Sequence, residues 1–281
     1  MRPPFAIALA LAAGIASPGT AAEPAVSTAE ATPGLSAAML HSGWTRPDGS
    51  RIAAIELRLE PGWKTYWRSP GEAGIAPSFD WSGSGNLGRV TYHWPVPEVI
   101  DSGGIRALGF HDRLLLPVEI APAEAGQPMP LSVAIEFGLC REICVPATVA
   151  LAAPPPAPGA AHDAAIEAAL AAAPATATGA PDCTVEDTAH GWRLAARLPA
   201  EAVPAAPGDE ALPAAVIELA SAEGPAPAWV SEAEIARDGD AVTASAEVIP
   251  DRAGYRFDPA SLRLTLIGGR AAVEFRGCAA G

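Results

Sequence analysis

The amino-acid sequence predicts an all-β fold of two immunoglobulin-like β-sandwich domains in tandem, joined by a Pro/Ala-rich connector that is partly helical. Three observations lead to this prediction. Apolar residues alternate at a period of two on both sides of the connector, and Gly, Pro, Asp and Ser fill the gaps between the alternating segments. No strand–helix–strand rhythm is found along the chain.

Residues 1–22 have the features of a secretory signal peptide. Arg2 precedes an apolar stretch from Phe5 to Ile15, and Thr20-Ala21-Ala22 supplies small residues for cleavage after Ala22. The stretch is too short to span a bilayer, and no later segment is apolar over the roughly 18 residues that a spanning helix needs. We therefore expect an exported protein of the periplasm, without a transmembrane segment of its own, in which disulfides can form.

The first domain is expected over residues 38–153, after a flexible lead-in over residues 23–37 that is rich in Ala, Thr, Ser and Pro. Each alternating set turns one face of a strand inward. The sets are Ile55, Leu57 and Leu59; Val90, Tyr92 and Trp94; Leu114, Leu116, Val118 and Ile120; Leu131, Val133, Ile135 and Phe137; and Val145, Ala147, Val149 and Leu151.

Residues 154–180 are expected to connect the two domains. Their prolines favour an extended, semi-rigid spacer, and the Ala-rich residues 160–173 are long enough for about three helical turns. The second domain is expected over residues 181–281, about the size of an immunoglobulin-like sandwich. Its alternating sets are Trp192, Leu194, Ala196 and Leu198; Val242, Ala244, Ala246 and Val248; Leu262, Leu264 and Leu266; and Val273 and Phe275.

Charge and motif content exclude several classes of function. The formal net charge is −14, and the 18 Lys and Arg residues are scattered singly, so the surface repels the phosphates of nucleic acids. No serine-hydrolase elbow, phosphate-binding loop, zinc-protease helix or dinucleotide fingerprint occurs. We expect no nucleic-acid partner, no cofactor and no metal, and we expect the five scattered histidines to be surface or turn residues.

Four cysteines allow three disulfide pairings, and the sequence alone leaves the pairing open. Position favours pairing within each domain. Cys183 and Cys278 bracket the second domain, and a bridge closing so long a loop gives on the order of 4.7 kcal/mol in the chain-entropy model. A structural disulfide is therefore expected there, since nothing near either residue indicates a second redox site.

Cys140 and Cys144 lie close together between two predicted strands. Closing so short a ring adds little stability, and strained or exposed bridges are often labile, so the pair is either redox-active or a hairpin staple. Spacing alone does not decide between these two interpretations. Arg141 favours a thiolate and Glu142 opposes it.

An ordered set of motifs resembles a known family. The motifs are Gly62-Trp63-Lys64-Thr65-Tyr66-Trp67-Arg68-Ser69-Pro70-Gly71, Phe79-Asp80-Trp81, Trp94-Pro95, Gly109-Phe110, Leu116-Pro117-Val118 and the segment from Cys140 to Pro146. Together they resemble the amino-terminal periplasmic domain of the thiol:disulfide interchange protein DsbD family, most closely the type in the copper-sensitivity suppressor protein ScsB. The resemblance is strong over residues 38–153 and weaker over the second domain.

The resemblance implies a thiol:disulfide oxidoreductase. Cys144 would form the mixed disulfide with a partner, Cys140 would resolve it, and Tyr66 and Phe110 would shield or line the site. The aromatic cap pair of the family is replaced by Ser102-Gly103-Gly104. The family's membrane and thioredoxin-like domains are missing from this sequence, so the implied donor is a membrane-embedded thiol protein on a separate chain. The implied acceptors are periplasmic thioredoxin-fold or disulfide-isomerase-like proteins.

Two other functions remain open from the residues themselves. The Cys140 and Cys144 thiolates are soft ligands that suit Cu(I), which would make the chain a Cu(I)-binding or copper-tolerance module. Met39 and Met129 are the only methionines beyond the predicted signal peptide, and neither is near the pair in sequence. The third possibility is a non-catalytic structural or interaction module.

Overall fold

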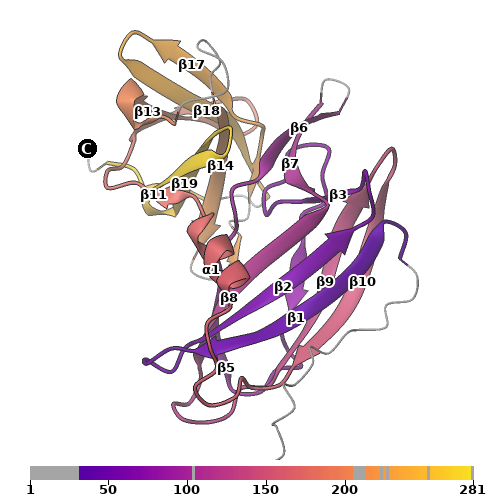
Figure 1. Cartoon of the computed structure of the whole chain (residues 1–281). Helices are drawn as coiled ribbons and strands as arrows, with labels where there is room; N and C mark the ends of the chain where they lie inside the picture. The colour runs from indigo at the N-terminus through magenta and orange to yellow at the C-terminus, as the bar shows by residue number, and fades with distance from the viewer. Residues whose placement is uncertain are drawn as a thin grey trace, which may run out of the picture.

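The computed structural model describes residues 32–102, 105–204, 213–221, 224–225, 228–251 and 254–279. The predicted signal peptide and most of the predicted lead-in lie outside the described residues. Within these residues the chain forms four β-sheets and one short α-helix, which confirms the all-β fold class (Figure 1). No helix in the described part of the chain is both long and apolar enough to cross a membrane.

Two sheets build the first sandwich, and all their strand pairs are antiparallel. The first sheet has the order β1 (Leu35–Thr45), β2 (Arg51–Leu59), β8 (Arg113–Pro122) and β5 (Leu87–Tyr92). The second has the order β10 (Cys144–Ala153), β9 (Leu131–Cys140), β3 (Lys64–Tyr66), β7 (Ile105–His111) and β6 (Glu98–Ser102), with β4 (Ser78–Asp80) also paired to β9.

The core of the first sandwich lies between these sheets. Inward residues of the predicted alternating sets, such as Leu116 and Val133, are buried in it. Strand β1 begins at Leu35, inside the segment predicted to be a flexible lead-in. The reason is that Leu35 pairs with Leu59 of β2 and so extends the sheet by three residues.

The second half of the chain is a sandwich of two further sheets. One has the order β11 (Ala175–Thr176), β20 (Ala271–Arg276), β19 (Leu262–Gly268), β14 (Ala214–Ser221) and β15 (Gly224–Pro225). The other has the order β12 (Asp182–Asp187), β13 (Trp192–Pro199), β18 (Ala241–Pro250) and β16 (Ala228–Val230), with β17 (Glu234–Asp238) also paired to β18. Short 3-10 turns are η1 (Ala200–Ala202) and η2 (Pro259–Ser261).

The connector is docked on the protein rather than extended as a spacer. Its helix α1 (Ala164–Ala171) is capped by the Asp163 side chain and buries Ile166 against Trp44, Ile52 and Leu115 on the outer face of the first sheet. Strand β11, which follows, pairs in parallel with β20 of the second sandwich. The helix is shorter than the predicted three turns, because only Ile166 in this Ala-rich segment is fully buried.

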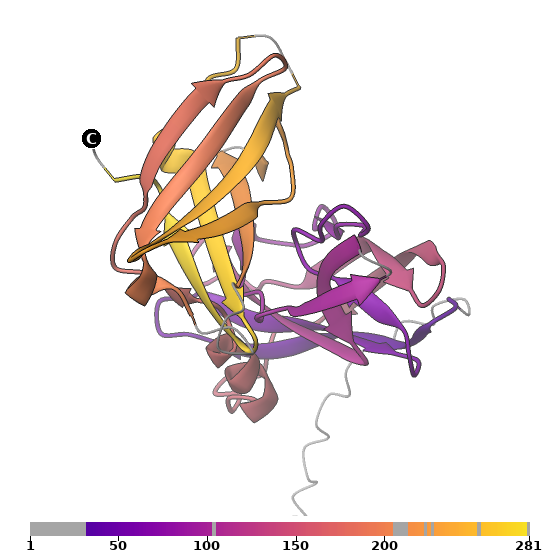
Figure 2. The ribbon, with the colours of Figure 1, turned by 90° about the horizontal axis from the view of Figure 1, so that it is seen from above.

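The two sandwiches pack directly against one another, side by side as Figure 2 shows. Strand β14 contributes side chains to both hydrophobic cores. Its Ala214 and Val216 belong to the core cluster of the first sandwich, whereas Ala215, Ile217 and Leu219 belong to that of the second. A strand that is apolar on both faces is expected where both faces are covered. Residues 69–72 of the loop between β3 and β4 lie at this interface.

Candidate redox-active disulfide

Cys140 and Cys144 form a disulfide at the tip of the hairpin between β9 and β10. Cys140 ends β9, Cys144 begins β10, and the two residues are directly opposite each other in the antiparallel register. The long, regular pairing of these two strands therefore fixes the position of both sulfurs. Residues 141–143 form the turn between them.

The two cysteines differ in exposure. Cys140 is 6% exposed and packs in a small cluster with Tyr66 and Ala107, whereas Cys144 is exposed. Its neighbour Ile143 is 76% exposed, so one large apolar side chain projects from the turn. A thiolate from another protein can therefore approach the sulfur of Cys144 but not that of Cys140.

Tyr66 brings a hydroxyl group to the exposed sulfur. Its Oη lies 3.0 Å from Cys144 Sγ and 3.4 Å from the carbonyl oxygen of Ala73. Burial raises the pKa of Tyr66, so its hydroxyl stays protonated at neutral pH. Because a disulfide sulfur carries no hydrogen, the hydroxyl is the donor. In the reduced protein it would donate to the Cys144 thiolate and stabilise the charged form.

Two glycines leave room for the Tyr66 ring. A Cβ at Gly138 would lie 3.0 Å from the ring and 2.8 Å from Cβ of Ile75. A Cβ at Gly74 would lie 2.8 Å from the ring and 2.3 Å from Cβ of Pro70. The loop of residues 69–76 therefore packs against Tyr66 and, through Ala73, reaches the disulfide. Sequence reasoning placed none of residues 72–76 in the site, although the glycine at 74 was a possible signal.

Phe110 lies on the other face of the sheet. Thr65 is paired with Phe110 and Tyr66 with Gly109, so the side chains of Tyr66 and Phe110 point to opposite faces. Phe110 is buried in the main core, with its ring centroid 6.4 Å from that of Trp94. The expected pair is thus divided: the structure brings Tyr66 to the disulfide and Phe110 to the core. Of the replaced cap, Gly103 and Gly104 lie outside the described residues.

Charged side chains surround the hairpin at different positions. The guanidinium of Arg141 lies 5.9 Å from the Trp63 ring centroid, and Arg141 and Glu142 are both exposed. Lys64 lies directly opposite Cys140 in the sheet and shares its face. A cation on this face of the sheet favours the thiolate form of a cysteine. The sequence did not indicate that Lys64 supplies this cation.

Cys183 and Cys278 form the other disulfide, between residues 95 apart in the sequence. Cys183 lies in β12, and Cys278 follows β20, so the bond joins the two sheets of the second sandwich. Both residues pack on the core of that sandwich. Among the described residues, no group of three or more His, Cys, Asp and Glu side chains is placed to hold a metal ion.

Replacing Tyr66 with phenylalanine tests the hydroxyl contact. Tyr66→Phe is expected to slow alkylation of reduced Cys144 by iodoacetamide at pH 7 by roughly 3- to 10-fold, because a hydrogen bond to a charged group is lost. The rate profile should move to higher pH. Tyr92→Phe is the matched control, since the Tyr92 hydroxyl accepts a hydrogen bond from Trp81 Nε1 instead. An unchanged pH profile in Tyr66→Phe would remove the hydroxyl from the site's chemistry.

Comparisons with known proteins place this geometry in context. Residues 36–156 match the family model described as thiol:disulfide interchange protein DsbD, N-terminal. The crystal structure of the N-terminal periplasmic domain of ScsB from Proteus mirabilis is 20% identical, with a TM-score of 0.59 over 91% of this chain and 98% of that one, which shows a shared fold.

A second solved structure covers a smaller part of the chain. The N-terminal domain of Neisseria meningitidis DsbD in the reduced form is 17% identical, with a TM-score of 0.24 over 36% of this chain and 75% of that one. No curated protein matches the sequence. The matched segment, residues 36–156, includes the whole hairpin of Cys140 and Cys144, so this part of the chain is similar to the DsbD N-terminal family.

Proposed function

We propose that this protein carries out thiol–disulfide exchange in the periplasm through Cys140 and Cys144. It would take electrons from a membrane-embedded thiol donor on a separate chain and pass them to disulfide-bonded periplasmic proteins of thioredoxin-fold or disulfide-isomerase-like type. The observation that carries the proposal is the unequal exposure of the two sulfurs, with Cys144 exposed and Cys140 buried.

The exposure difference supports a separate role for each cysteine. In the reduced protein, the Cys144 thiolate attacks one sulfur of a client disulfide, the client bond breaks, and its other sulfur leaves and takes up a proton. Cys140 then loses its proton and attacks Cys144 Sγ, which breaks the mixed disulfide and releases the second client sulfur. The released sulfur also takes up a proton, so the client has gained two electrons and two protons. Counted from its dithiol form, the protein has lost both thiol protons and formed the Cys140–Cys144 disulfide.

The surroundings of the pair support this order of events. A buried Cys140 cannot meet a client disulfide but lies next to Cys144 across the hairpin, which suits a resolving thiol. The Tyr66 hydroxyl beside Cys144 Sγ would favour the thiolate that attacks. Re-reduction by the donor follows the same steps in reverse, beginning with attack of a donor thiolate on Cys144.

The reduction potentials of the two disulfides test the proposal. We expect the Cys140–Cys144 pair to have a potential above roughly −300 mV, because exposed bridges of short rings are easily reduced, and the Cys183–Cys278 pair to lie below it. Equilibration in dithiothreitol buffers of known potential, followed by alkylation and peptide mass analysis, reports each pair separately. If the first pair also lies well below that value, it is a hairpin staple and the proposed exchange is wrong.

A further inference from the structure

The loop of residues 69–76 contacts the disulfide site with one end and faces the second sandwich across a cavity with the other. Ala73, Gly74 and Ile75 lie against Tyr66, Gly138 and the sulfur of Cys144. Residues 69–72 line a cavity of about 220 Å³ whose opposite wall comes from residues 214–217 and 229–233 of the second sandwich. One short segment thus connects the two halves of the chain at the site.

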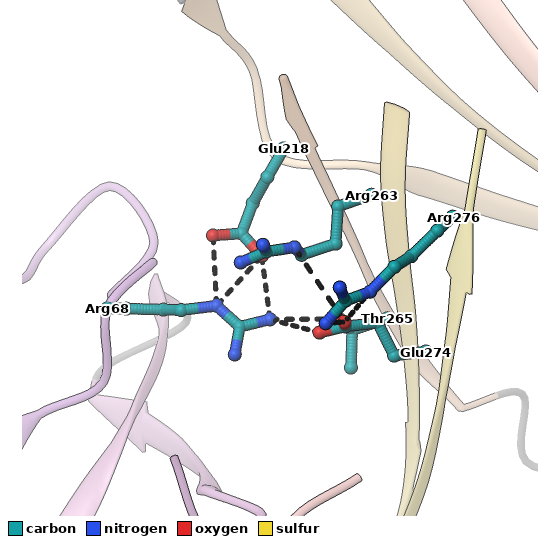
Figure 3. Close-up of polar contacts among 6 residues, drawn as sticks. All are labelled: Arg68, Glu218, Arg263, Thr265, Glu274 and Arg276. Carbon is teal, nitrogen blue, oxygen red and sulfur yellow. Dashed lines mark hydrogen bonds and ion pairs between the residues drawn. The ribbon is translucent and has the colours of Figure 1, made fainter. Parts of the chain in front are cut away.

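Arg68, which immediately precedes this loop, fastens it to the second sandwich (Figure 3). Its Nε donates to both carboxylate oxygens of Glu218 at 3.1 Å, and one terminal nitrogen donates to Glu218 at 2.9 Å and to Glu274 at 2.8 Å. The same nitrogen lies 3.3 Å from Thr265 Oγ1. All three acceptor residues belong to the sheet of β14, β19 and β20.

The environment of Arg68 makes this attachment stronger than an ordinary surface ion pair. Its side chain is 15% exposed and that of Glu274 is 8% exposed, so solvent screens the pairs only in part. The guanidinium also lies 4.1 Å above the centre of the buried Trp67 ring, which fixes its orientation. A two-point arginine–carboxylate contact is directional as well as charged.

We infer that the second sandwich positions the loop of residues 69–76 over the Cys140–Cys144 disulfide, with Arg68 as the positioning residue. The inference rests on the proposed function of the pair and gives the second sandwich a role in it. With the Arg68 contacts in place, Ala73 and Gly74 stay against Tyr66 and restrict the approach to the exposed Cys144 sulfur from the side of the loop. Without them, the loop has room to move into the cavity lined by residues 69–72 and to widen that approach.

The rate at which dithiothreitol reduces this disulfide measures the shielding directly. One thiolate of the reagent attacks Cys144 Sγ, and Cys140 leaves as a thiolate. The second reagent thiol then closes its ring, so two electrons pass to the protein and Cys144 is released. Arg68→Ala is expected to raise this rate about tenfold, because the loop then opens more often. Peptide mass analysis after alkylation follows the pair separately from Cys183 and Cys278.

Three further variants distinguish positioning from a general loss of stability. Glu218→Gln weakens the same contact from the second sandwich and should raise the rate in the same direction. Arg68→Lys keeps the charge and should restore a rate closer to that of the unchanged protein. Arg276→Ala is the matched control, because Arg276 pairs with the same Glu274 but makes no contact with the loop in the described structure.

Rates within twofold of the unchanged protein for both Arg68→Ala and Glu218→Gln would overturn the inference. An equal increase in Arg276→Ala would also overturn it, because the effect would then follow the ion-pair cluster as a whole. The reagent needs no biological partner, so this assay can succeed or fail whatever the outcome for exchange with client proteins. Conversely, a low reduction potential of the Cys140–Cys144 pair would exclude the proposed function, but the reduction rates of the variants could still be compared.

Discussion

Cys140→Ala is expected to accumulate mixed disulfides with its protein partners, at least about tenfold more than Cys144→Ala. In Cys140→Ala the exposed thiol of Cys144 survives and still attacks a client disulfide, but the thiol that would resolve the intermediate is gone. In Cys144→Ala the remaining thiol is that of Cys140, which is buried beside Tyr66 and Ala107 and cannot reach a client. The expected contrast follows from burial alone.

The measurement is made on periplasmic extracts of cells that express each variant. After rapid alkylation with acid quenching, non-reducing gels show the mixed disulfides, and mass spectrometry identifies both cysteines of each cross-link. The variant lacking both Cys140 and Cys144 controls for cross-links through Cys183 or Cys278. Equal trapping by the two single variants would remove the assignment of roles but keep the exchange activity, and no trapping by either would argue against exchange.

Strands that have one buried face were predictable from the sequence. The alternation from Leu114 to Ile120 corresponds to β8, and that from Leu131 to Phe137 corresponds to β9, because period-two burial is a local property of the chain. Strand β14 did not appear among the alternating sets. Its two faces are both apolar because one faces its own core and the other faces the first sandwich. The alternation is therefore absent where the two halves meet.

The candidate site was predictable only in part. The cysteine pair and Tyr66 were predicted from motifs that are each contiguous in the sequence. The position of the loop of residues 69–76 depends on contacts between distant residues, which no local sequence pattern indicates. Arg68 and Glu218, which fasten that loop, are 150 residues apart. The face on which Phe110 lies depends on the register between β3 and β7. This register is a tertiary property, and a resemblance to family motifs does not predict it.

Replacing Cys183 and Cys278 together with alanine is expected to lower the free energy of unfolding of the second sandwich by roughly 2–5 kcal/mol. The bond closes a loop between residues 95 apart, so its loss releases much chain entropy in the unfolded state. The folded state keeps backbone hydrogen bonds at the same place, from Cys278 N to Pro259 O and from Ala279 N to Pro181 O. The sandwich should therefore fold without the bond, at lower stability.

Denaturant unfolding followed by tryptophan fluorescence and circular dichroism measures this loss. The matched control replaces Cys140 and Cys144 with alanine, which should cost less because that ring spans only a separation of four residues. Below the unfolding transition, the rate at which dithiothreitol reduces the Cys140–Cys144 pair should change little in the Cys183/Cys278 variant, because Arg68 keeps its partners on β14 and β20. If the free energy of unfolding falls no more than in the control, the Cys183–Cys278 bridge does not stabilise the second sandwich. A peptide map that joins Cys183 to Cys140 or Cys144 would refute the pairing itself.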